Sequence, residues 1–164
     1  YADVGFEAVI DDETDVDIYS LTADASFGIF DMFSLRAGFG RGNTDDIPGD
    51  NLDITTFTYG GQGHYSVAKK LDLFGEVLGY FTELNSNATT RSDVGFIYTA
   101  GVRFQAAKKF EIDAEYSYTS GDVDDDSIAL AGILKFTRAF SGRVEVSYID
   151  SDTLGYFAGL RLNF

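Results

Sequence analysis

The sequence predicts an all-β fold, a transmembrane up-and-down antiparallel β-barrel of ten strands, with eight strands as the alternative. Three observations predict it. Ten segments alternate between apolar and polar residues, which is the pattern of a strand with two different faces. The connections between them alternate between short ones with positive or neutral residues and acidic ones, as expected of a meander in which every second connection lies at the same end. One face of each segment is almost free of charge, whereas the other carries a charged or polar residue near its middle.

The composition agrees with such a barrel. The chain has 164 residues, enough for one closed barrel, and we expect a single domain over residues 1–164. Aromatic residues make up 15% of the sequence, and 18 glycines accompany a single proline, which is typical of strands joined by tight turns. The net charge of −15 argues against a nucleic-acid partner, whose phosphates require a basic surface. The absence of cysteine excludes disulfides and thiolate metal sites.

The alternating pattern sets the positions of the strands. We expect them at residues 2–11, 16–28, 34–43, 54–67, 71–83, 94–106, 110–120, 127–138, 143–150 and 153–164. No window longer than about one turn has the 3.6-residue period of a helix. A tilted strand needs roughly 9–11 residues to cross a bilayer, so most of these segments are long enough.

The connections are of two kinds. The short ones are residues 30–33, 68–70, 107–109 and 139–142, and the acidic ones are residues 11–15, 43–53, 83–93, 121–126 and 150–152. In a meander every second connection lies at the same end, and an even number of strands brings both termini to the short-turn end. Short turns of outer-membrane barrels face the periplasm, so we expect both termini to be periplasmic.

The polar faces of the strands predict a ring of charge inside the barrel. In chain order, the ring residues are Glu7, Asp24, Arg36, Gln62 with His64, Glu76, Arg103, Glu115, Lys135, Glu145 and Arg161. Their signs alternate over the second half of the chain, and buried charges need partners. We expect Arg161 to point inward between Glu145 and Glu7, once the last strand closes on the first. The alternative is a soluble lipid-binding barrel of ten strands, in which the two faces are exchanged.

The last strand carries a family resemblance. Leu160, Leu162 and Phe164 place apolar residues at the fifth-last, third-last and last positions. This terminus resembles the C-terminal insertion signal of bacterial outer-membrane β-barrels, and the whole chain resembles the OmpA/OmpX-like porin superfamily. The resemblance implies an outer-membrane location, assembly by the barrel-assembly machinery, and contact with outer-membrane lipid and lipopolysaccharide. Ten strands depart from the eight of the commonest small members.

The charged connections have several interpretations. Asp122, Asp124 and Asp126 have the first spacings of a helix-loop-helix calcium site but lack its later glycine and carboxylate. Loose binding of divalent cations to the acidic loops is one interpretation, and solvated charge that keeps the loops out of the bilayer is the other. Lysine pairs at 69–70 and 108–109 lie in short turns, either as polar turn residues or as contacts for anionic headgroups.

No motif predicts an enzyme or a cofactor. His64 is the only histidine, and Ser66 on the same face does not by itself make a hydrolase dyad. The leading hypothesis is a barrel with a charged lumen that side chains largely fill, serving a structural, envelope-stability or surface-interaction role. The first alternative is a narrow cation-favouring channel, for which Glu76 and Glu115 are the expected lumen carboxylates. The second alternative is the soluble lipid carrier.

Overall fold

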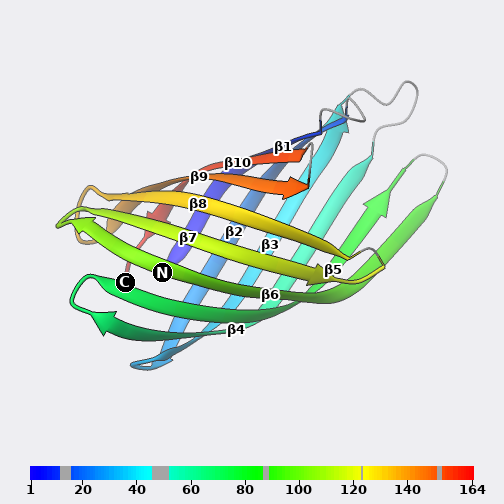
Figure 1. Cartoon of the computed structure of the whole chain (residues 1–164). Coiled ribbons are helices and arrows are strands. Elements are labelled where there is room, and N and C mark those ends of the chain that lie inside the picture. The colour runs from blue at the N-terminus through cyan, green and yellow to red at the C-terminus, as the bar shows by residue number, and fades with distance from the viewer. Residues whose placement is uncertain (12–15, 46–51, 87–88, 123, 151–152) are drawn as a thin grey trace.

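The computed structural model describes residues 1–11, 16–45, 52–86, 89–122, 124–150 and 153–164. Ten strands form one closed antiparallel barrel (Figure 1), in which each strand pairs with its neighbours in the sequence and β10 pairs with β1. The ten-stranded up-and-down prediction is therefore confirmed, and the eight-stranded alternative is wrong. The described residues include no helix of the length and apolar character that crossing a membrane demands.

The strands are close to the predicted segments, and several extend further. They are β1 (Ala2–Asp11), β2 (Val16–Phe30), β3 (Phe33–Asp45), β4 (Asp53–Ala68), β5 (Leu71–Asn85), β6 (Thr90–Ala107), β7 (Phe110–Ser120), β8 (Asp125–Lys135), β9 (Phe140–Asp150) and β10 (Thr153–Leu162). The extra length of β3, β5 and β6 lies mainly at the end of the long connections. These strands continue because their polar residues still pair with neighbouring strands in the ladder.

The turn between β8 and β9 differs from the prediction. It occupies residues 136–139 instead of 139–142. The Phe136 and Thr137 amides both donate to the Phe140 carbonyl, at 3.0 and 3.1 Å, and close the turn before Ser141. Ser141 and Gly142, whose composition is typical of a turn, instead pair with β8 and β10. Strand β10 is also two residues shorter than predicted, because the prediction extended to the end of the chain.

Both termini lie at the end of the short turns (Figure 1). The Asn163 amide donates to the Ala139 carbonyl at 2.8 Å, which fixes the C-terminal segment beside the β8–β9 turn. The Ser26 amide donates to the Tyr1 carbonyl, also at 2.8 Å. We call this end of the barrel the short-turn end and the opposite end the long-loop end.

The two faces of the barrel wall have opposite character. Most large apolar residues on the outer face are exposed, for example Leu21 at 60% and Val144 at 62%, whereas Asp3 and Arg161 on the inner face are 3% and 6% exposed. The soluble carrier requires the reverse arrangement, so that alternative is wrong. Phe74 and Tyr80, two large rings on the charged face of the sequence pattern, are buried in the interior. The outer surface therefore suits a hydrocarbon environment, and polar groups collect within the wall.

Candidate functional site

The interior of the barrel gathers the charged residues of the strands. All ten residues predicted for the ring are on the inward-facing parity and are buried or half-buried: Glu7, Asp24, Arg36, His64, Glu76, Arg103, Glu115, Lys135, Glu145 and Arg161. Their ion-pair partners differ from the prediction, in which the mid-strand charges of neighbouring strands pair with one another in a single ring around the lumen.

One ion pair crosses over a whole strand. The guanidinium of Arg36 on β3 donates to Glu76 on β5 at 2.5 Å. Gln62, on the intervening strand β4, donates to the same carboxylate oxygen at 3.4 Å. Such a pair satisfies two charges that burial would otherwise make costly. The contact also draws the side chains of β3 and β5 together across the inner face of β4.

A second cluster forms where the barrel closes. Arg161 donates from Nε and Nη2 to both carboxylate oxygens of Asp3, at 2.8 and 2.7 Å. Arg143 on β9 lies 3.7 Å from the same carboxylate and also pairs with Glu145. The expected position of Arg161 between Glu145 and Glu7 is thus wrong. The β1–β10 register pairs Arg161 with Asp3, four residues before Glu7 along β1.

The third cluster lies on β6, β7 and β8. Arg103 Nε is 3.3 Å from Asp113 and 3.4 Å from Glu111, and Lys135 Nζ is 3.1 Å from Glu111. The sequence pattern suggested Glu76, Glu115 and Glu145 as the neighbours of these cations, and that suggestion is wrong. The true partners occupy the inward parity closer to the strand ends, where a search for mid-strand charges does not look.

Sequence reasoning therefore missed Asp3, Glu111, Asp113 and Arg143. Each is on the polar face of its strand, so the parity that identified the others also marks these four. The sequence does not reveal the stagger between neighbouring strands, which decides which inward side chains lie at the same height along the barrel axis and can contact each other.

Aromatic rings stack on the paired arginines. The guanidinium carbon of Arg161 lies 4.1 Å from the Tyr1 ring centroid, that of Arg103 lies 5.5 Å from Phe74, and that of Arg143 lies 5.6 Å from Phe157. We call the resulting group the ion-pair layer. It comprises Tyr1, Asp3, Arg36, Phe74, Glu76, Arg103, Asp113, Arg143, Phe157 and Arg161. A cavity of about 190 Å³ remains between these residues except Asp3 and Phe157, and Glu115 also lines it.

A different cavity lies against β1 to β4. It measures about 220 Å³ and is lined by Glu7 and Asp24 together with hydroxyl groups and bare backbone. The hydroxyls belong to Ser20, Thr22, Thr56 and Thr58, and the bare positions are Gly38, Gly40 and Gly42. Among the described residues, neither carboxylate forms a salt bridge. We call this space the hydroxyl-lined cavity.

Gly38 makes the narrowest part of this cavity possible. A Cβ at this position would lie 2.4 Å from Oδ1 of Asp24 and 2.4 Å from Oγ1 of Thr58. Any side chain here must displace both polar groups. The glycine therefore lets two polar side chains of β2 and β4 approach each other over β3.

The remaining predicted residues are placed as follows. His64 is half-buried and opposite Phe74 in the β4–β5 register. Leu160 and Leu162 are on the outer face of β10, and Phe164, beyond the end of that strand, is 80% exposed. Their role as an insertion signal stays a prediction.

The acidic loops are only partly described. Glu13, Asp15 and residue 123 lie outside the described residues. Within the described part of the chain, no group of three or more histidine, cysteine, aspartate or glutamate residues is suited to a metal ion. Asp93 accepts from the Tyr80 hydroxyl at 2.6 Å and from the Asp122 amide at 3.2 Å. Loose divalent-cation binding stays a prediction.

Comparison with known proteins agrees with this architecture. No protein-family model matches the chain, and no curated protein matches its sequence. Among solved structures, the NanC porin is 10% identical, with both chains covered completely and a TM-score of 0.63. The KdgM porin in complex with disordered oligogalacturonate is 15% identical over 99% of each chain, with a TM-score of 0.53.

A third solved structure extends the comparison beyond porins. The translocator domain of the autotransporter NalP from Neisseria meningitidis is 10% identical, over 99% of this chain and 87% of that one, with a TM-score of 0.57. Identities this low show the fold. At the level of the fold, the resemblance noted in the sequence is confirmed: the chain is a small closed antiparallel β-barrel, similar in fold to these solved structures.

Proposed function

We propose that this barrel lies in the bacterial outer membrane with its short-turn end and both termini in the periplasm, and that the ion-pair layer closes its lumen. Its role is then structural, in envelope stability or surface interaction, and not the passage of solutes. The apolar outer face supports the membrane position, because exposed apolar surface of this extent has a large cost in water. The acidic long loops support the orientation, since outer-membrane barrels carry their longer loops outside the cell.

The observation that carries the closed lumen is the reach of the ion pairs across strands. Arg36 on β3 bonds to Glu76 on β5, and Arg143 on β9 lies beside Asp3 on β1. Rings stacked on the arginines occupy further cross-section. A barrel of about eight strands has an interior that side chains can fill, and ten strands are only slightly wider. Together these side chains leave small, separate cavities.

Single-channel recording in planar bilayers tests the closed lumen. The wild-type protein is expected to give no steady current. The double variant Arg36→Ala with Glu76→Ala removes both charges of one pair, so that neither remains buried alone, and is expected to produce a steady conductance. Thr58→Ala, at the hydroxyl-lined cavity, is the matched control and should stay silent. A steady, ion-selective current of porin size from the wild type would refute the closed lumen.

A narrow cation-favouring channel is the second candidate, because one observation favours it. Glu7 and Asp24 line the hydroxyl-lined cavity without a salt bridge to another described residue, so their charge is available to a passing cation. Glu76, which the sequence suggested for this task, is engaged by Arg36. If the wild type conducts, Asp24→Asn should lower its preference for cations. The same substitution has no current to alter in a closed barrel.

A further inference from the structure

The short-turn end is basic although the chain as a whole is strongly acidic. Lys108, Lys109, Lys135 and Arg138 surround one pocket of about 530 Å³ at this end. Phe136 and Asn163 also line it. We call this space the basic rim pocket. Four cations around one hollow contrast with a net charge of −15 for the whole sequence.

Backbone hydrogen bonds hold the basic rim pocket together. The Lys135 amide donates to the Lys109 carbonyl at 2.8 Å, which joins the β8–β9 turn to the β6–β7 turn. The Asn163 amide, bonded to Ala139, adds the C-terminal segment. Of the four cations, only Lys135 forms a salt bridge to a described residue, Glu111. The pocket is therefore a fixed group of backbone segments with unneutralised positive charge, which is complementary to an anion.

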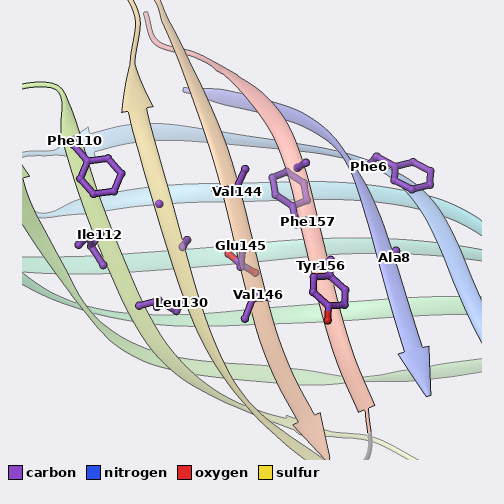
Figure 2. Close-up of a pocket in the computed structure, with 13 residues that line it drawn as sticks. Phe6, Ala8, Phe110, Ile112, Leu130, Val144, Glu145, Val146, Tyr156 and Phe157 are labelled. Carbon is purple, nitrogen blue, oxygen red and sulfur yellow. The ribbon is translucent and has the colours of Figure 1, made fainter. Parts of the chain in front are cut away.

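An apolar groove lies on the outer face of the same strands. It measures about 630 Å³, and its lining includes Phe110, Leu130, Val144 and Tyr156 (Figure 2). Leu130 and Val144 are 56% and 62% exposed, so the groove opens outward. Phe110 begins β7, directly after the β6–β7 turn, and therefore marks the end of the groove nearest the short turns.

Two aromatic rings connect the basic rim pocket to the groove. Phe136 lines the pocket, and its ring is next to Gly142, where an added Cβ would lie 3.0 Å away. Phe110 lines the groove, and its ring is 3.5 Å from the equivalent position at Gly132. Leu134 pairs with both Phe110 and Gly142, so the two rings are on adjoining parts of one surface.

The dimensions match one leaflet of a bilayer. Along β9, Val146 in the groove is six positions after Phe140, which lies at the short-turn end. At about 3.3 Å per residue this is roughly 20 Å along the strand. A strand tilted by about 40° covers roughly 15 Å of depth over that length, which is half of a hydrocarbon core about 30 Å thick.

We propose that the basic rim pocket and the groove form one binding site for an anionic glycerophospholipid. Lys108, Lys109 and Arg138 hold the phosphate, and an acyl chain lies in the groove. The inference rests on the proposed membrane position of the short-turn end. It does not depend on whether the lumen conducts, because the three cations that hold the phosphate lie in the short turns and the groove lies on the outer face.

Native mass spectrometry of the full, detergent-solubilised protein titrated with phosphatidylglycerol tests the headgroup pocket. A cation at a membrane surface contributes about 1 kcal/mol to the binding of anionic lipid, or about fivefold in affinity. Lys108→Gln with Lys109→Gln is therefore expected to weaken phosphatidylglycerol binding by more than tenfold. The matched control is Lys69→Gln with Lys70→Gln, which removes the same charge from another short turn and should change the Kd less than twofold.

The groove has its own pair of variants. Ala158→Leu places a larger side chain in the groove and is expected to weaken phosphatidylglycerol binding severalfold, whereas Ala37→Leu, on the outer face of β3, should not. Competition with inorganic phosphate tests whether the groove contributes to lipid binding. A lipid held by both the pocket and the groove should resist displacement, so full displacement at millimolar phosphate would show that the pocket alone binds and that free phosphate suffices as its ligand.

Three results would overturn the proposal. If the two double-lysine variants lose the same affinity for phosphatidylglycerol, the lipid is attracted to the whole basic end and not to this pocket. If the wild type binds phosphatidylcholine as tightly as phosphatidylglycerol, the site does not recognise the charge of the headgroup. Retention on isolated peptidoglycan that needs Lys108 and Lys109, with phosphatidylglycerol binding unchanged, would assign the pocket to the cell wall. None of these readouts changes with conductance, so failure here is distinguishable from failure of the closed lumen.

Discussion

The two walls of the lumen are built differently. On the inner face of β3, three successive inward positions near the long-loop end are Gly38, Gly40 and Gly42. On the inner face of β5, by contrast, the inward positions include the large side chains of Phe74, Leu78 and Tyr80, all buried. One closed barrel thus has a wall that leaves space and a wall that fills it. How far the lumen is filled therefore depends on the size of the side chains at inward positions and not on the number of strands alone.

The prediction with the largest effect concerns the contribution of the ion-pair layer to stability. Asp3→Asn removes the carboxylate that holds Arg161 and Arg143, so that the buried Arg161 loses its ion-pair partner and Arg143 keeps only Glu145. We expect a loss of about 3–5 kcal/mol in the free energy of unfolding, measured by denaturant titration in detergent micelles.

Asp24→Asn is the matched control, because Asp24 lies opposite Asp3 in the β1–β2 register. This carboxylate has no salt bridge to a described residue, so its neutralisation should change the free energy of unfolding by less than about 0.5 kcal/mol. Equal losses at Asp3 and Asp24 would contradict the stabilising role of the ion pairs that Asp3 forms.

The second prediction uses one substitution at two inward glycines. At Gly101 an added Cβ would lie 2.4 Å from the Phe74 ring and 2.8 Å from the Ala114 carbonyl oxygen. At Gly40 the nearest atom is a Thr22 methyl at 3.7 Å. Gly101→Ala is therefore expected to destabilise the barrel by about 1–3 kcal/mol through overpacking, whereas Gly40→Ala should be neutral or slightly stabilising. Thermal unfolding followed by gel mobility compares the two, and a larger loss at Gly40 would reverse the assignment of the walls.

The smallest effect concerns the potential within the hydroxyl-lined cavity. The chain has no cysteine, so Thr22→Cys introduces a unique thiol beside Glu7 and Asp24. Two negative charges at about 8 Å in a water-like medium contribute about 0.5 kcal/mol each, or about twofold each in local cation concentration. A cationic thiol reagent should label this cysteine about fourfold faster than a neutral one. Adding Glu7→Gln and Asp24→Asn should remove the preference, and an unchanged rate ratio would show that these carboxylates do not set the potential.

Most of the fold was predictable from the sequence, because two-residue periodicity survives wherever one face of a strand meets a different environment from the other. The exceptions have local causes. Ser141 and Gly142 have the composition of a turn, yet hydrogen bonds from residues 136 and 137 close the turn earlier. Whether such residues form a turn or pair in a strand cannot be read from the alternation of apolar and polar residues.

The site was predictable only in part. Parity marked Arg161 as inward, but its partner Asp3 depends on the stagger of β1 against β10, which no local pattern encodes. In the same way, Lys108 and Lys109 were recognisable as turn residues, whereas the pocket they share with Asn163 requires the C-terminal segment to return beside them. Long-range pairing creates both features, and a single sequence does not reveal it.

The pairing of β1 with β10 has a consequence for the folding pathway. The Arg161–Asp3 contact joins residues 158 positions apart, and β1 has an unpaired edge until the last strand arrives. Contacts of such sequence separation form slowly, because most of the chain must be ordered before they return any stabilisation. Every intermediate that lacks β10 presents two open edges capable of pairing with another chain. Pairing of β10 with β1 removes both open edges and with them the tendency to aggregate. Substitutions at this pairing, such as at Asp3 or Arg161, are therefore expected to lower the yield of folded protein as well as its stability.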